Sequence, residues 1–235
     1  MRVISRIWHV YKGVEIESLT GIIFSFQFKD LNDRSRVLLG APWTFDNALL
    51  VLEEPVGKGS IEKMAFNMCD FWVQIYQVPL LCSSREIRWF LGEMIGVVLD
   101  VDGGLAGDGV GKFLRVRVRI DITKPLRRCL RVDILGDGVE TIMLLRYERL
   151  PHFCFKYGKI GHTMNKCQSE DQIPVVNGMG KPLFGAWMKV SSILRKNYLR
   201  NFRGLSEINN HNITSCIKVD TDSKMMMPTS SLNEV

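Results

Sequence analysis

The stretch "GIIFSFQFKDLNDRSRVLLGAPWTFDNALLVLEE" (residues 21–54) decides the fold class, because its periodicity changes twice. Residues 21–28 alternate between large apolar side chains and other residues, which is typical of a strand with one buried face. Asp30 is an N-cap residue and Gly40 a helix-ending residue, so they delimit a short helix. Residues 47–54 then form the next strand. The stretch therefore predicts strands and helices that alternate along the chain.

Upstream of this stretch, residues 1–8 predict the end of a helix and residues 13–19 a strand. The order helix–strand–strand–helix–strand is the ferredoxin-like (βαββαβ) arrangement of an RRM-like unit without its first strand. We assign this truncated unit to residues 1–56. Because the first strand is missing, we expect residues 11–54 to expose an unpaired sheet edge or an open core.

A second, β-rich and basic unit follows over residues 70–150. It contains a strand ended by Pro79, a helix over residues 83–96, and a hairpin around "GDG" at 136–138. Its clearest strand is "KFLRVRVRID" (112–121). Residues 171–235 lose this periodicity, apart from the apolar segment "KPLFGAWMKV" (181–190), and predict a mostly disordered tail. The fold class is α+β.

The net charge of +6 is uneven along the chain. Residues 1–111 hold 10 Lys and Arg against 14 Asp and Glu, whereas residues 112–167 hold 13 against 5. Clustered Lys and Arg attract a polyanion and make its binding depend on salt. The alternative is a solvated strand face without a ligand.

Composition excludes two classes of protein. No run approaches the 18 apolar residues of a membrane span, and residues 1–13 lack the features of a secretory signal. The six cysteines are therefore expected to be reduced thiols in an intracellular protein, with the nucleus left open as its compartment. No Ser/His/Asp or paired-carboxylate pattern occurs, and the chain has only four histidines. We expect neither an enzyme nor a small-molecule substrate.

The segment "HFCFKYGKIGHTMNKCQ" (152–168) predicts a degenerate zinc knuckle over residues 151–168. Cys154, His162 and Cys167 are spaced as three ligands of one zinc ion, because short spacings let one tight loop supply a tetrahedral set. Gly158 and Gly161 stand where such a loop turns. Tyr157 occupies the fourth-ligand position, and a phenol is a poor zinc ligand at neutral pH.

The order of segments resembles one plant family. The segments "FKDLNDRSRVLLGAPWTFDNALLVLEE", "FWVQIYQVPL", "IGVVLDVD", "FLRVRVRIDITKPLRR" and "LRYERLPHFCFKYGKIGH" resemble the plant domain of unknown function 4283 followed by a C-x2-C-x4-H-x4-C knuckle. The segment "LFGAWMKV" is similar to the "FG-x-W-[LM]-[RK]" that follows the knuckle there. The resemblance covers about residues 1–190. It implies the nucleic-acid-binding, gag-like part of a LINE-type retrotransposon, with no catalytic activity.

The resemblance implies that single-stranded RNA or DNA is the partner, bound with low sequence specificity. Phe155 matches the aromatic residue that stacks on a base. Lys and Arg side chains are expected to contact phosphates, and the candidates are Lys156, Lys159 and Lys166 of the knuckle and Arg115, Arg117 and Arg119 of the strand 112–121. The three arginines alternate with Val116 and Val118, so they form one row on the strand face opposite the core, about 7 Å apart.

Zinc is the implied cofactor, bound weakly or not at all because Tyr157 replaces a Cys. Water or His152 could fill the fourth position. In the alternative, the knuckle is not functional and the chain is a protein–protein module that self-associates as a homo-oligomer. We expect no interaction with membranes.

Overall fold

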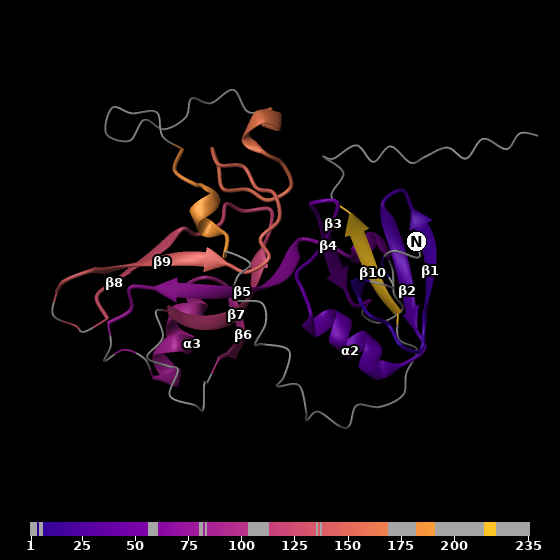
Figure 1. Cartoon of the computed structure of the whole chain (residues 1–235), viewed down its shortest axis with the longest axis horizontal. Helices are drawn as coiled ribbons and strands as arrows, with labels where there is room; N and C mark the ends of the chain where they lie inside the picture. The colour runs from indigo at the N-terminus through magenta and orange to yellow at the C-terminus, as the bar shows by residue number, and fades with distance from the viewer. Residues whose placement is uncertain are drawn as a thin grey trace, which may run out of the picture.

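The computed structural model describes residues 4, 7–55, 61–79, 82, 84–102, 113–134, 136, 138–168, 182–190 and 214–219, the last range by its backbone alone. Strands predominate and helices are few, in agreement with a mixed α/β class. No helix in these ranges is long and apolar enough to cross a membrane. The strands form two five-stranded sheets, here called sheet A and sheet B (Figure 1).

Sheet A has the strand order β1-β2-β10-β4-β3, and every neighbouring pair is antiparallel. The N-terminal region supplies four of its strands and the tail supplies β10. The elements are β1 (Val14–Thr20), β2 (Ile23–Phe28), α2 (Leu31–Leu39), β3 (Trp43–Phe45), β4 (Ala48–Glu53) and β10 (Thr214–Val219). Residues 214–219 form a strand within the tail predicted to be mostly disordered, whereas residues 171–181, 191–213 and 220–235 of that tail lie outside the described residues. The ferredoxin-like arrangement stays a prediction.

Helix α2 begins where the sequence predicts, at the N-cap Asp30, whose carboxylate accepts hydrogen bonds from the backbone N–H groups of Asn32 and Asp33. Val37 of α2 packs in a small core with Trp8, Phe26, Phe28 and Leu50. Through this cluster, α2 and the segment around Trp8 pack against one face of sheet A.

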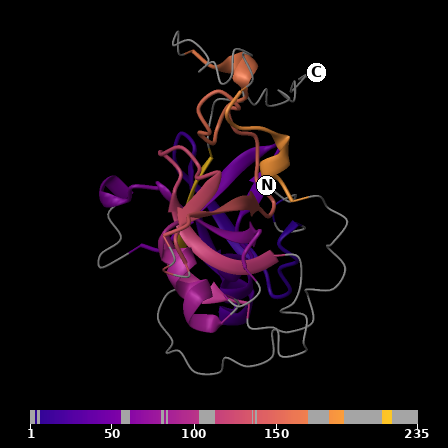
Figure 2. The same ribbon diagram turned by 90° about the vertical axis from the view of Figure 1, so that its left-hand side faces the viewer.

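Sheet B has the order β6-β7-β5-β9-β8 and is also antiparallel throughout. It comprises β5 (Met68–Tyr76), β6 (Val97–Val101), β7 (Phe113–Asp121), β8 (Cys129–Val132) and β9 (Thr141–Tyr147), with α3 (Arg85–Glu93) packed on β6 and β7. Single 3-10 turns are η1 (Ile61–Lys63), η4 (Met164–Lys166) and η5 (Ala186–Met188). Figure 2 shows the knuckle segment above sheet B, on the opposite side from α3.

The large core lies at sheet B and extends to strand β4 of sheet A and to the knuckle segment. Phe71, Val73, Val116 and Val118 are fully buried at its centre, and the apolar face of β7 lies against this core as the alternation predicts. Residues of β4 and of the knuckle segment join the same cluster. Sheet A, sheet B and the knuckle are therefore held together by continuous apolar packing.

The cysteines whose side chains are described carry free thiols, namely Cys69, Cys82, Cys129, Cys154 and Cys167. Burial raises the pKa of the Cys69 thiol to about 12, so this side chain is held in its unreactive protonated form.

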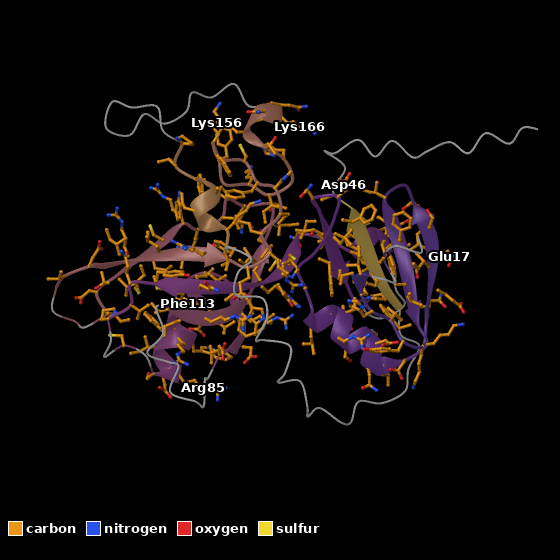
Figure 3. The ribbon with its side chains drawn as sticks, in the orientation of Figure 1. Glu17, Asp46, Arg85, Phe113, Lys156 and Lys166 are labelled. Atoms are coloured by element: carbon orange, nitrogen blue, oxygen red, sulfur yellow. The ribbon has the colours of Figure 1, made fainter. Side chains whose placement is uncertain are left out.

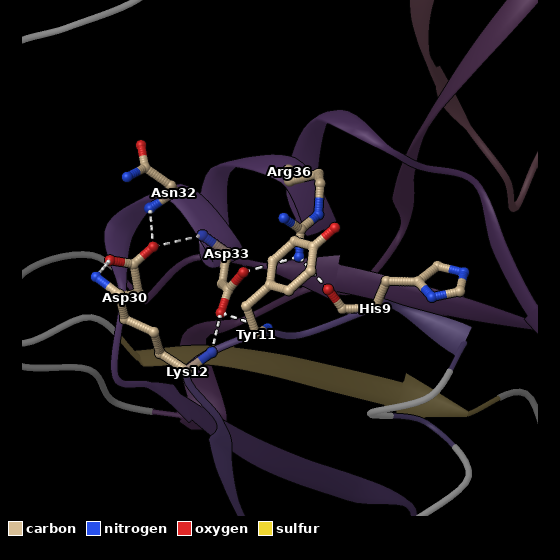
Figure 4. A network of polar contacts seen from close by, with 7 residues as sticks. All are labelled: His9, Tyr11, Lys12, Asp30, Asn32, Asp33 and Arg36. Atoms are coloured by element: carbon tan, nitrogen blue, oxygen red, sulfur yellow. Dashed lines mark hydrogen bonds and ion pairs between the residues drawn. The ribbon is translucent and has the colours of Figure 1, made fainter. Parts of the chain in front are cut away.

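A buried carboxylate anchors the chain before β1 to α2 (Figure 4). One oxygen of Asp33 accepts the backbone N–H groups of Tyr11 and Lys12, each at 2.9 Å, and the other accepts Arg36 at 2.8 Å. Only 2% of the Asp33 side chain is exposed. Removing it would leave two N–H groups without their acceptor, which costs folding free energy.

We therefore expect Asp33→Ala to lower the free energy of unfolding by about 2–4 kcal/mol, as measured by urea denaturation. Asp30→Ala, which removes the N-cap of the same helix, is the matched control and should cost less, because 17% of that side chain is exposed. Equal losses in the two variants would contradict the anchoring role of Asp33.

Candidate metal centre and nucleic-acid interface

The first half of the knuckle is a tight turn closed by backbone hydrogen bonds. Phe153 and Ile160 form an antiparallel bridge, the N–H of Cys154 donates to the carbonyl of Lys159 at 2.8 Å, and the N–H of Gly158 donates to the carbonyl of Cys154 at 2.7 Å. Gly158 has a φ of +74°, a region that glycine adopts without strain. The turn brings Cys154 back toward the following loop.

The second half of the knuckle carries the other two candidate ligands. Gly161, at a φ of +108°, donates its N–H to the carbonyl of His152 at 3.3 Å and directs the chain toward His162. The turn η4 follows, and the N–H of Cys167 donates to the carbonyl of Met164 at 3.2 Å. The glycines predicted at the turns therefore do adopt left-handed conformations.

The structure brings the three predicted ligands together. The ligand atoms of Cys154, His162 and Cys167 all lie within 4.8 Å of one another. Ligands at about 2.0–2.3 Å from zinc, in tetrahedral geometry, lie somewhat less than 4 Å apart, so only a small closure is needed. His152 is not part of this group, and its side chain is exposed. Two thiols and one imidazole are a donor set that zinc prefers, so the residues present fit the ion.

The environment of Cys154 favours a metal-bound thiolate over a free one. Burial raises the pKa of the Cys154 thiol, the backbone N–H groups of Tyr157 and Lys156 lower it, and the nearby Cys167 thiol raises it again. A dication placed between the sulfurs would reverse the cost of ionising them. The N–H groups directed at the sulfur would then stabilise the thiolate further.

Tyr157 lies on the same turn, three residues after Cys154. Its side chain is half-buried, and the Lys156 ammonium lies 5.2 Å from the centre of its ring. The three-ligand group is thus the candidate zinc site among the described residues, and the role of Tyr157 as a lost ligand stays a prediction.

Residues outside the motif hold the knuckle in place. The N–H of Leu126 donates to the carbonyl of Gly158 at 2.9 Å, and the N–H of Phe184 donates to the carbonyl of Phe155 at 3.3 Å. The Phe184 ring covers Gly158 so closely that a Cβ there would lie 2.3 Å from it. Sequence reasoning did not assign Leu126 or Phe184 to the site, although the apolar segment 181–190 indicated order beyond the knuckle.

Gly158→Ala should therefore lower the free energy of unfolding by about 2–4 kcal/mol, because it adds both left-handed strain and overpacking. Gly136→Ala is the matched control: Gly136 has a φ of +69°, but no atom lies within 4 Å of the place that its new methyl group would take, so only the strain is added. Thermal and urea denaturation of the two variants would measure the difference. Equal costs would show that the contact with Phe184 does not matter.

Phe155 and the three predicted lysines differ in exposure. Phe155 is half-buried and packs on Phe153, with ring centres 5.0 Å apart. Lys159 and Lys166 are exposed, whereas Lys156 is partly buried. Figure 3 shows Lys156 and Lys166 at the end of the knuckle that points away from the sheets. Lys156 and Lys166 thus form a basic end of the knuckle, and base stacking by Phe155 stays a prediction.

The arginine row of β7 is covered by other side chains to a greater extent than expected. Arg115, Arg117 and Arg119 do share one face, but the side chains of Arg115 and Arg117 are largely covered there. Arg115 forms a bidentate ion pair with Glu148 at 2.7 and 2.9 Å, and its guanidinium lies 3.8 Å from the centre of the Trp72 ring. Acids and aromatic rings from neighbouring strands thus occupy the positions where phosphates were expected.

Arg117 is the most enclosed of the three, with 5% of its side chain exposed. It reaches Asp70 at 3.5 Å and the carbonyl of Leu38, at the end of α2, at 3.4 Å. Arg119 is half exposed and forms a bidentate pair with Asp70 at 2.7 and 3.2 Å. The expectation that all three arginines face solvent was wrong, and their contact with nucleic acid stays a prediction.

Comparisons with known proteins match two separate parts of the chain. Residues 1–54 match the family model "Domain of unknown function (DUF4283)", and residues 120–169 match the model "Zinc knuckle" of the CCHC type. The second match begins within β7, so it includes Leu126. An uncharacterized protein of Arabidopsis thaliana is 26% identical over 135 residues, which are 57% of this chain. The match spans 42% of that relative's length. No solved structure matches the chain.

Proposed function

We propose that this chain binds single-stranded RNA or DNA with low sequence specificity through its zinc knuckle and catalyses no reaction. The observation that carries the proposal is the convergence of Cys154, His162 and Cys167 on a module whose free end carries lysines. Lysine ammonium groups contact phosphates without reading bases, which accounts for low specificity. The match to a zinc-knuckle model supports nucleic-acid binding in general.

Zinc would be held by Cys154, His162 and Cys167, and its contribution would be structural: it would fix the loop that presents the lysines. Because the Phe184 ring packs on Gly158 and the N–H of Leu126 donates to the Gly158 carbonyl, the loop has support beyond the metal. This support allows a three-ligand site to keep its shape at low zinc occupancy.

We propose further that the chain derives from the gag-like part of a LINE-type retrotransposon and acts inside the cell. The order of the two matched segments supports this origin. We also propose that sheet A and α2 form a ferredoxin-like unit. The support for this proposal is β10, which lies between β2 and β4 and is antiparallel to both.

The test is the salt dependence of binding of the full chain to a fluorescently labelled single-stranded oligonucleotide. For single strands, each phosphate contact contributes about 0.7 to the slope of log K against log salt. The variant Lys156→Gln, Lys159→Gln, Lys166→Gln should flatten that slope by about two units. The matched control, Lys29→Gln, Lys63→Gln, Lys124→Gln, removes the same charge from exposed positions off the knuckle and should leave the slope nearly unchanged.

Equal slopes in both triple variants would place the nucleic acid elsewhere than on the knuckle. No measurable binding by the folded wild-type chain would overturn the proposal and favour the self-association module.

A further inference from the structure

Strand β10 lies at the centre of sheet A, although it comes from the far end of the chain. Residues 214–218 pair with residues 23–27 of β2, and residues 216–219 pair with residues 50–53 of β4. Strands β2 and β4 are not neighbours in the sheet. Figure 1 shows β10 between them. The single segment 214–219 therefore joins two hairpins, β1–β2 and β3–β4, into one sheet.

The main-chain groups of β2 and β4 would lose their hydrogen-bond partners without β10. If β10 leaves, β2 and β4 face each other across one vacant strand position, about 10 Å apart at twice the strand spacing. Both facing edges then expose unpaired N–H and C=O groups, which are templates for another strand. The two edges run so that one strand can be antiparallel to both.

The burial of β4 shows that its surroundings are those of a central strand. Leu49, Leu50 and Val51 are all buried in succession, with Leu50 in the core around Trp8 and the other two in the core of sheet B. Apolar cover on both faces is typical of an internal strand and not of an edge. The sequence "TSCIKV" suits the position, since Thr, Ile and Val favour strands.

We propose that the groove between β2 and β4 is a strand-receiving site and that its occupant is this chain's own tail segment, Thr214–Val219. Recognition is by β-strand addition: main-chain hydrogen bonds on both sides hold the segment. Because Thr214–Val219 is covalently linked to sheet A, its pairing is intramolecular and takes place at a high effective concentration. A free peptide of the same sequence therefore fits the same groove when the tethered strand cannot pair.

Ile217→Pro in the full chain tests the site, because Ile217 pairs with Phe24 on one side and Leu52 on the other. Proline removes an N–H donor and is excluded from central strands. We expect the midpoint of thermal unfolding to fall by roughly 6–12 °C. Amide exchange in β2 and β4 should accelerate, while that in β5 and β7 should stay slow. Ser230→Pro, a tail substitution outside β10, is the matched control and should change neither quantity.

Adding a saturating concentration of a peptide of residues 211–222 to the Ile217→Pro variant should reverse roughly half or more of the fall in the midpoint of thermal unfolding. The same peptide carrying the Ile217→Pro change should restore nothing. An unchanged midpoint in the variant, or no difference between the two peptides, would overturn the site. A wild-type dimer that becomes a monomer in Ile217→Pro would also overturn it as stated, because the occupant would then be the strand of a second copy.

Discussion

Tyr157→Cys in the full chain should tighten zinc binding by about two orders of magnitude. Structural zinc in knuckle-sized peptides contributes about 10–16 kcal/mol, so each of four ligands accounts for roughly 3 kcal/mol. Tyr157 lies three residues after Cys154 on the turn whose N–H groups face the Cys154 sulfur. A thiol at this position would add a fourth ligand to the two cysteines and one histidine already present. Competitive titration against a chromophoric chelator would measure both dissociation constants.

The full chain is the right material for this measurement. Cys154 is fully buried, and Leu126 and Phe184, which lie outside residues 151–168, hold the turn by hydrogen bonds and packing. An isolated knuckle peptide would lose these contacts and would not report the affinity of the folded site.

Tyr157→Phe is the matched control, because it removes the phenol oxygen and keeps the ring. It should bind zinc as the wild type does. If Tyr157→Cys and the wild type have equal affinities, Tyr157 does not stand at a lost ligand position. A loss of affinity in Tyr157→Phe would mean that the phenol itself coordinates the ion.

The sequence predicts the ligand group well because the group depends on short spacings. Cys154, His162 and Cys167 lie within one loop, and two glycines with left-handed conformations make that loop close on itself. The alternation in β7 is equally local, so the burial of Val116 and Val118 is confirmed. In both cases, the pattern and the structure that it specifies lie within the same few residues.

The surroundings of β7 could not be predicted in this way. Glu148, Asp70 and the carbonyl of Leu38 come from three other segments, and only tertiary structure brings them to the arginines. Periodicity assigns Arg117 to a face of its strand but does not say what covers that face. The same limit applies to β10, whose partners in β2 and β4 lie far away in the sequence. The packing of Phe184 on Gly158 is a third example.

Arg117 of β7 reaches from sheet B to the end of α2, and Asp70 is its ion-pair partner. Arg117 is buried between this carboxylate and the end of α2, and its Nε has no hydrogen-bond partner among the described residues. Burial lowers the pKa of Arg117, and Asp70 opposes that shift. Without Asp70, the enclosed guanidinium would keep only the Leu38 carbonyl oxygen at 3.4 Å and the weaker attraction of Asp100 to compensate its charge.

We therefore expect Asp70→Ala to lower the free energy of unfolding by about 3–5 kcal/mol, the cost of leaving one member of a buried ion pair alone. Urea denaturation of the full chain would measure it. The double variant Asp70→Ala, Arg117→Met should recover most of the loss, because no uncompensated charge remains. Arg119→Met is the control on the same carboxylate: half of that side chain is exposed, so its loss should cost under about 1 kcal/mol. A double variant no more stable than Asp70→Ala would mean that Asp70 acts through something other than the charge of Arg117.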